Sequence, residues 1–131
     1  ASALDEINII ERSKNYGWPQ IKGDQTQNGM QTPIIHSGSD TWAPSGAAYL
    51  PTRQAGLDGS IFYAGLRGQS LFEYNIETKS LISHLKGELG RIRDVVLGPD
   101  NLLYITTSIR DGRGIPGNSD DKIIRINPAM L

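Results

Sequence analysis

The sequence predicts an all-β fold that forms part of a β-propeller. The 131 residues include 15 glycines, and short apolar runs recur between turns of Gly, Pro, Asp and Asn. Short apolar runs separated by these turn residues are typical of short antiparallel strands. Aligning Phe62-Tyr63 with Leu103-Tyr104 gives a repeat of about 40 residues, in the range of four-stranded propeller blades. A β-sandwich has similar strands, so the repeat is what favours the propeller.

The first third of the chain predicts two short strands around a long polar loop. Ile7, Ile9 and Ile10 alternate within the first run, over 6–10, and a second apolar run covers 33–36. Between them, Gly17 precedes Trp18-Pro19, which indicates a turn into an extended segment.

From residue 43 onward the same strand–turn–strand pattern occurs twice. The first copy predicts strands at 45–50, 59–65, 70–75 and 80–85, the second at 93–98, 102–108 and 122–127. We therefore expect residues 1–36 to be outer strands of a preceding blade, 43–86 a complete blade and 90–131 the last blade. The chain opens within a strand-like run and without an initiator Met, which predicts a fragment of a larger propeller.

Charge and composition exclude several classes of partner. The formal net charge is −1, so the chain lacks the basic surface of a nucleic-acid binder. No apolar run approaches the roughly 18 residues of a membrane helix. The absence of cysteine excludes disulfides and thiolate metal sites.

The residues that could bind a ligand or take part in catalysis lie in loops that a propeller places on one face. In this architecture the loop before an innermost strand and the loop between the second and third strands emerge on the same side. Those loops hold Thr41, Trp42, Arg67, Arg91, Arg93, Arg110, Asp111 and Arg113. The opposite face receives ordinary turns, so the asymmetry predicts a site.

Arg91 and Arg93 flank Ile92, and at a period of two both guanidinium groups point to one side. With Arg67 from the neighbouring blade, they suit a ligand that carries several carboxylates or phosphates. The alternative is that Arg93 pairs with Asp94 or Asp111 in a solvated network. Trp42 is either a stacking platform or a plug at the channel mouth.

The remaining polar residues give weaker signals. His84 lies in an outer strand and is expected to be structural or exposed, and His36 lacks the positioned carboxylate of a catalytic pair. Asp111, Asp120 and Asp121 do not have EF-hand spacing, which leaves Ca²⁺ in their loop open.

Several ordered motifs resemble the C-terminal third of the soluble quinoprotein glucose/sorbosone dehydrogenases. They are DEINII, NYGWP, TWAPSG, GLRGQ, GRIRDVVLGPDN, LYITTS and KIIRIN. The TWAPSG and TSIRDGRG versions look most like the archaeal aldose sugar dehydrogenases of that family. The resemblance implies a six-bladed propeller, an extracytoplasmic location, and oxidation of aldoses at C1 with electrons passed to an external acceptor.

The resemblance also implies pyrroloquinoline quinone and Ca²⁺ as cofactors of the full-length protein. Arg91, Arg93, Arg67 and Thr41 match cofactor-binding positions, while Trp42, Asp111 and Arg110 are candidates for the substrate pocket. The family's catalytic histidine base lies in an earlier blade, and the carbonyls that hold Ca²⁺ fall at or just before Ala1. This chain is therefore expected to carry one wall of the site, to bind neither cofactor by itself, and to be inactive alone.

Two other classes stay open at this point, a Ca²⁺-dependent lactonase and a non-catalytic propeller module. We also expect the isolated chain to self-associate through open blade flanks, which sedimentation would test. The residues expected on those flanks are Phe62, Leu71, Leu103 and Ile105.

Overall fold

The computed structural model describes residues 3–50 and 59–131. It divides the chain into two compact units, 1–43 and 44–131, which are considered separately. Strands account for the secondary structure of both units apart from one short 3₁₀ helix, η1 (Pro128–Met130), so the all-β prediction is confirmed. No helix in the described residues is long and apolar enough to cross a membrane.

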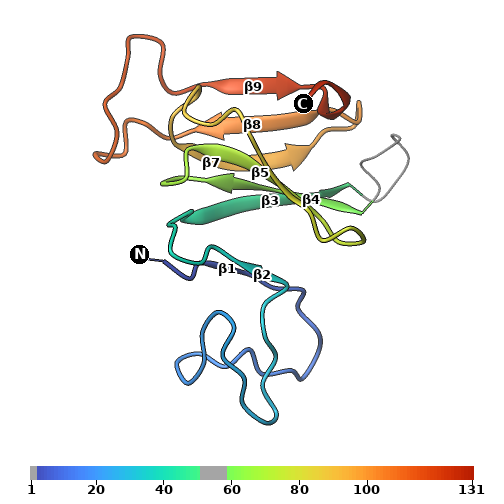
Figure 1. The fold of residues 1–131 in the computed structure, drawn as a ribbon. Coiled ribbons are helices and arrows are strands. Elements are labelled where there is room, and N and C mark those ends of the chain that lie inside the picture. The colour runs from blue at the N-terminus through green and yellow to red at the C-terminus, as the bar shows by residue number, and fades with distance from the viewer. Residues whose placement is uncertain (1–2, 51–58) are drawn as a thin grey trace. The chain divides into compact units, whose positions relative to one another are not determined.

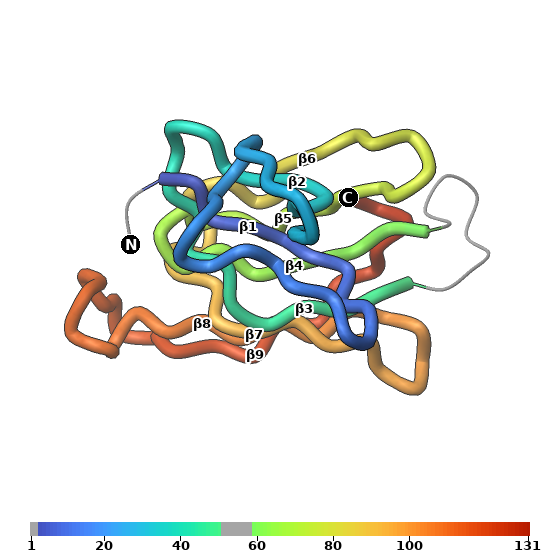
Figure 2. Tube along the Cα trace, turned by 90° about the horizontal axis from the view of Figure 1, so that it is seen from below, coloured from blue at the N-terminus to red at the C-terminus, as the bar shows by residue number. Residues whose placement is uncertain are grey.

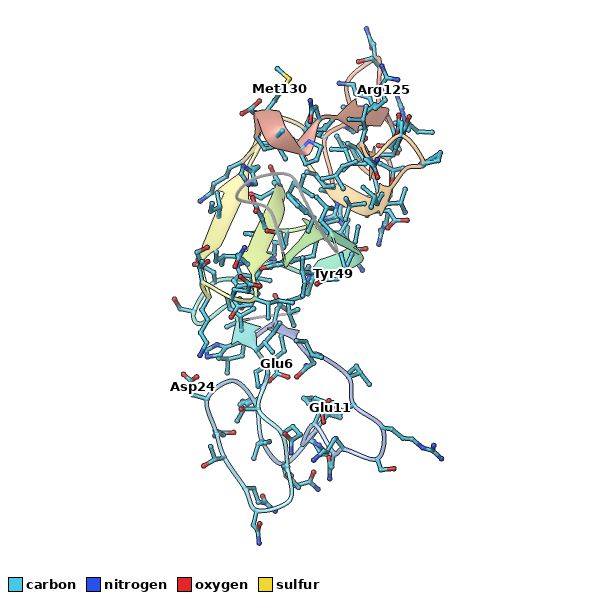
Figure 3. The ribbon with its side chains drawn as sticks, turned by 90° about the vertical axis from the view of Figure 1, so that its right-hand side faces the viewer. Glu6, Glu11, Asp24, Tyr49, Arg125 and Met130 are labelled. Carbon is cyan, nitrogen blue, oxygen red and sulfur yellow. The ribbon has the colours of Figure 1, made fainter. Side chains whose placement is uncertain are left out.

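The first unit contains one short antiparallel pair, β1 (Glu6–Ile7) and β2 (Ile35–His36). The long loop between them carries Glu11 and Asp24 (Figure 3). The prediction that the first strand continues to Ile10 is wrong. The Tyr16 hydroxyl donates to the Ile9 carbonyl at 2.6 Å and accepts from the Glu11 amide at 2.8 Å, so a side chain satisfies this backbone in place of a neighbouring strand.

The second unit contains two antiparallel sheets (Figure 1). The first sheet is β3 (Pro44–Leu50), β4 (Ser60–Gly65), β5 (Ser70–Asn75) and β6 (Leu81–His84), paired in chain order. The second is β7 (Ile92–Leu97), β8 (Leu103–Thr107) and β9 (Ile123–Ile126). All seven strands fall where the turn residues predicted them.

The core of this unit lies between the two sheets. Its fully or nearly fully buried members are Leu50, Phe62, Ala64, Leu71, Ile92, Val95, Leu103 and Ile105. Phe62, Leu71, Leu103 and Ile105 were expected on open flanks, and that placement is wrong because the two sheets cover each other's apolar faces. Self-association of the chain stays a prediction. Exposed apolar residues lie on the outward side of the second sheet, where Val96 is 51% and Ile123 78% exposed, and on the two edge strands of the first, at Tyr49 and Ile82.

A buried polar network crosses three strands of the first sheet. Glu73 accepts a hydrogen bond from the Ser60 hydroxyl at 2.7 Å and bonds the His84 imidazole Nε2 at 2.8 Å. His84 also stacks on Phe62, with ring centroids 6.3 Å apart. His84 is therefore a structural residue that fastens the outer strand to the sheet.

The two sheets approach most closely where β3 passes β7. A Cβ placed on Gly46 would overlap the Asp94 side chain and lie 2.8 Å from the Asp94 Cα. The ladder between β7 and β8 shifts register between Ile92 and Asp94. This bulge turns both Ile92 and Val95 toward the core, although simple alternation would separate them.

We predict that Gly46→Ala destabilises the full-length protein by about 1–3 kcal/mol, because the added methyl forces β3 and β7 apart. The melting temperature measures the effect. Gly117→Ala is the matched control, because the nearest atom to its new Cβ is an Asp120 oxygen at 3.5 Å. Equal melting temperatures for the two variants would contradict the close approach at Gly46.

Candidate functional site

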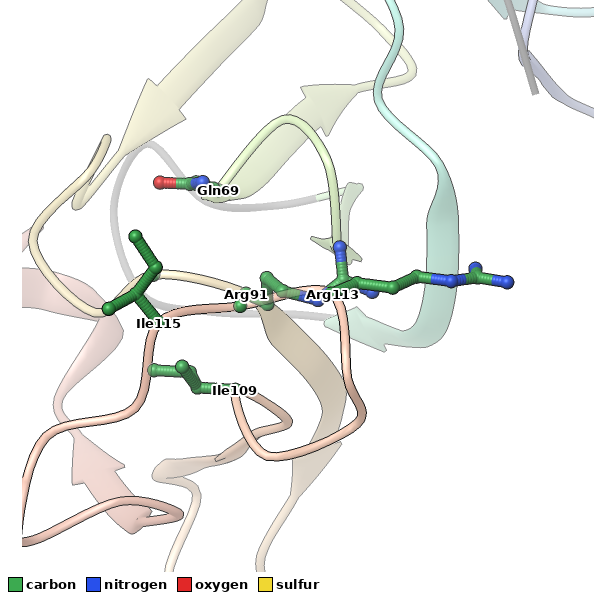
Figure 4. A pocket seen from close by; sticks show the side chains of 7 residues that line it. Gln69, Arg91, Ile109, Arg113 and Ile115 are labelled. Carbon is green, nitrogen blue, oxygen red and sulfur yellow. The ribbon is translucent and has the colours of Figure 1, made fainter.

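Three loops of the second unit converge on a pocket of about 340 Å³. They are the β4–β5 turn, the loop before β7 and the loop between β8 and β9 (Figure 4). The lining residues are Gln69, Gly90, Arg91, Ile109, Arg113, Gly114 and Ile115. The β7–β8 turn lies at the opposite end of the strands from the β8–β9 loop (Figure 2). Within this unit, the predicted loops do meet at one end.

Backbone hydrogen bonds hold the three loops together. The Gly87 amide donates to the Gln69 carbonyl at 2.9 Å, which joins the β4–β5 turn to the loop before β7. The Ser108 amide donates to the Arg91 carbonyl at 2.9 Å, which joins that loop to the start of the β8–β9 loop. Main-chain hydrogen bonds therefore hold the pocket walls in place without help from side chains.

Arg91 links the same three loops through its side chain. Its guanidinium donates to the Ser108 carbonyl at 3.2 Å, to the Leu66 carbonyl at 3.5 Å and to Asp111 Oδ2 at 2.7 Å. The side chain is only 10% exposed. A buried guanidinium requires such a set of acceptors, because its charge is costly to desolvate without them.

Arg93 reaches the same carboxylate from the solvent side. Its NH2 group lies 3.4 Å from Asp111 Oδ2, and its side chain is 46% exposed. The shared oxygen places both guanidinium groups on one side of the chain, and the alternative pairing of Arg93 with Asp111 is the one observed. The hydrogen bond from Arg91 is the main cause that holds the pKa of Asp111 below its ordinary value.

The other polar residues of the β8–β9 loop close the loop on itself. The Arg110 guanidinium donates to the carbonyls of Asp120 and Gly117, the latter at 2.9 Å. Asp121 accepts from the Ile109 amide, and Asp120 from the Gly117 amide. Arg110 is thus engaged in shaping the loop, and its part in substrate binding stays a prediction.

Arg67 lies exposed in the β4–β5 turn, next to the Leu66 carbonyl that Arg91 contacts. Thr41 and Trp42 belong to the first unit. There the Asp5 carboxylate accepts from the amides of Trp42 and Ala43 at 2.8 and 3.0 Å, and Thr41 Oγ1 accepts from the Ala3 amide. That Thr41 and Trp42 share a face with the arginines stays a prediction.

Sequence reasoning missed five residues that line the pocket: the glycines Gly90 and Gly114, and the side chains of Gln69, Ile109 and Ile115. Gln69 follows Arg67 in a predicted site loop, and its positive φ of 49° marks the tight turn that presents it. The two isoleucines are apolar residues in a loop otherwise rich in glycine and charge. An apolar residue in such a loop could have been noted as a candidate ligand contact. In the structure Ile115 is 97% exposed, so the fold does not need it for the core.

In residues 3–50 and 59–131, no three His, Cys, Asp or Glu side chains are grouped as metal ligands. The carboxylates of Asp120 and Asp121 instead accept backbone amides of their own loop. The carbonyls expected to hold Ca²⁺ fall at or before Ala1, which lies outside the described residues.

The two packed antiparallel sheets, with an arginine-lined pocket at one end, correspond to β-propeller blades of the solved structures that the chain resembles. The family model for glucose/sorbosone dehydrogenases matches residues 1–125, and the chain belongs to that family. It superposes with a TM-score of 0.82 on the pyrroloquinoline quinone-bound aldose sugar dehydrogenase of Streptomyces coelicolor. The two are 35% identical, over 95% of this chain and 36% of that one.

Two curated proteins are also similar to this chain. An uncharacterised protein of Synechocystis is 31% identical, over 83% of this chain and 30% of its own length. The aldose sugar dehydrogenase YliI of Escherichia coli is 29% identical, over 82% of this chain and 33% of its own length. The chain thus spans about a third of the proteins that it resembles.

We predict that Asp111 stabilises the folded protein in a pH-dependent way. Because its pKa is lower in the folded than in the unfolded state, its contribution is present above the ordinary aspartate pKa of about 3.9. It is lost as the pH falls through the folded-state value. The difference in melting temperature between the full-length wild type and Asp111→Asn should therefore be constant near neutral pH and shrink in acid.

The exposed Glu77 supplies the control for this measurement. Glu77→Gln should leave the melting temperature close to that of the wild type across the same pH range. A gap between wild type and Asp111→Asn that persists undiminished in acid would show that the charge of Asp111 is not what stabilises the loop.

Proposed function

We propose that the full-length protein is an aldose sugar dehydrogenase that uses pyrroloquinoline quinone, and that this chain forms one wall of the cofactor site. Membership of the family and the likeness to a quinone-bound aldose sugar dehydrogenase support the reaction class. The observation that carries the site is the arginine pair: both guanidinium groups contact the Asp111 carboxylate, and Arg91 also lines the pocket. Similarity to archaeal members in particular is part of the proposal.

The residues present fit such a cofactor. Pyrroloquinoline quinone is a planar, polycarboxylated molecule, and guanidinium forks bind carboxylates with two parallel hydrogen bonds. Arg93 is half-exposed, and its contact with Asp111 uses one of five N–H donors. Arg67 on the adjacent turn adds a second exposed cation. When bound, the quinone supplies the chemistry of accepting a hydride equivalent from the sugar.

The residues of this chain would bind and orient, without transferring protons. Arg93 and Arg67 would engage the cofactor carboxylates, and Thr41 would add a hydroxyl donor. Most N–H groups of Arg91 are hydrogen-bonded to the surrounding loops. Its positive charge would still lie near the carboxylate edge of the cofactor and stabilise the extra negative charge of the reduced quinone. Trp42, Asp111 and Arg110 would lie toward the substrate. The proton at the C1 hydroxyl would go to a base outside this chain, and Ca²⁺ would bind outside the described residues.

An activity assay on the full-length protein tests the reaction class. With pyrroloquinoline quinone, Ca²⁺, an aldose and a dye acceptor, we expect dye reduction, and none from this chain alone. Lactone hydrolysis without dye reduction would replace the proposal with a Ca²⁺-dependent lactonase. Absence of both reactions in a protein that binds ligands at this face would indicate a non-catalytic module.

We predict that Arg93→Ala weakens quinone binding by the full-length protein by about 1.5–3 kcal/mol, the usual loss for charge-assisted hydrogen bonds. Its melting temperature should change little, because the side chain is half-exposed. Arg91→Ala should weaken binding and also lower the melting temperature, because its side chain joins three loops. Fluorescence titration with the quinone and thermal unfolding measure the two effects.

Arg125→Ala is the matched control for loss of a cation, because Arg125 extends from β9 into solvent (Figure 3). Its quinone affinity should equal that of the wild type. If Arg93→Ala behaves like this control, the arginine pair does not bind the cofactor and the proposed site is wrong.

A further inference from the structure

Asp111 occupies the position at which both arginines of the candidate site meet. Its Oδ2 accepts from Arg91 at 2.7 Å and lies 3.4 Å from Arg93 NH2, while its Oδ1 accepts from the Arg113 amide at 3.0 Å. The side chain is 20% exposed. Two donors from the start of the second sheet and one amide of its own loop therefore contact this carboxylate.

The loop that carries Asp111 is itself well anchored. Asp121 accepts from the Ile109 amide, and the Arg110 guanidinium binds the Asp120 and Gly117 carbonyls. These contacts lie on both sides of Asp111 in sequence. The carboxylate is held by its loop and is not free to follow the arginines.

Two guanidinium groups on one side of a strand repel each other, and an intervening carboxylate offsets that repulsion. Arg93 also has a long, half-exposed side chain, which loses rotamer freedom when it binds a ligand. A fixed carboxylate restricts that freedom before the ligand arrives. Its single long contact with Arg93 leaves most of the guanidinium donors available.

We propose that Asp111 is a positioning residue, which holds Arg91 and Arg93 side by side so that Arg93 is oriented to bind an anionic ligand. The inference rests on the proposed function, since it concerns the same quinone-binding arginines. It assigns Asp111 a role through those arginines, in addition to its proposed place toward the substrate.

A double-mutant cycle in the full-length protein tests this role. We expect Asp111→Asn and Asp111→Ala to weaken quinone binding about tenfold, the lower end of the loss seen when a residue that supports a metal ligand is replaced. In an Arg93→Ala background the same changes should have almost no further effect, because the residue through which Asp111 acts is gone. Asp111→Glu, which keeps the charge, should lie closer to wild type than Asp111→Asn.

Two further measurements separate positioning from a general loss of structure. Asp111→Asn should still unfold cooperatively, at a melting temperature above the temperature of the titration, so that its loss of quinone affinity is measured on folded protein. Asp100→Asn is the matched control, since Asp100 also has a lowered pKa, through the Tyr104 hydroxyl, but lies in the β7–β8 turn at the other end of the strands. Its quinone affinity should be that of wild type.

The outcomes distinguish this inference from the proposed function. If Arg93→Ala binds the quinone as well as wild type, the cofactor site is wrong and the role of Asp111 falls with it. If Arg93→Ala weakens binding but the Asp111 variants bind equally well or more tightly, the carboxylate competes with the ligand and only this inference fails. Additive losses in the cycle would also overturn it, because they place Asp111 outside the action of Arg93.

Discussion

The packing of the β3–β6 sheet against the β7–β9 sheet is the constraint on which the second unit depends. The core cluster between the two sheets takes its buried side chains from both of them. Gly46 lets β3 approach β7 so closely that even a methyl group would overlap Asp94. This contact fixes the distance between the sheets, and with it the distance between the loops at their ends. The cationic pocket is a consequence of that spacing.

The buried side chain of Arg91 makes the pocket depend on the packing of the two sheets. A guanidinium that is 10% exposed needs acceptors on several sides, and it finds them on the β4–β5 turn, the β8–β9 loop and Asp111. None of these acceptors is near Arg91 in sequence. They come together only when both sheets have formed and packed. Folding of this unit and assembly of its arginine pair are therefore one process.

The sequence was sufficient to predict the strands but not the detailed site. Turns such as Gly98–Asn101 and the alternation of apolar residues located all seven strands of the second unit, because those signals are local. The end of the first strand at Ile7 depended on a tyrosine side chain that bonds the following backbone. Likewise, the alternation around Ile92 indicated that Arg91 and Arg93 lie on one side of the chain. It did not indicate that Arg91 is buried and Arg93 exposed, because loops distant in sequence determine this. Such contacts have no local sequence signature.

The two polar clusters of the second unit differ in a way that assigns their roles. Ser60, Glu73 and His84 bond one another across adjacent strands, and the carboxylate and imidazole are 7% and 12% exposed. A network closed in this way stabilises its sheet and offers little to a ligand. The Arg91–Asp111–Arg93 cluster is instead anchored at its buried end and solvated at the other, where Arg93 is 46% exposed. An anion is recognised best by N–H donors that are already oriented before it binds and that are not used in hydrogen bonds within the protein. The exposed N–H groups of Arg93, held by Asp111, meet both conditions. In our proposal, ligand recognition therefore belongs to the cluster that joins different loops, whereas the cluster that joins neighbouring strands stabilises the sheet.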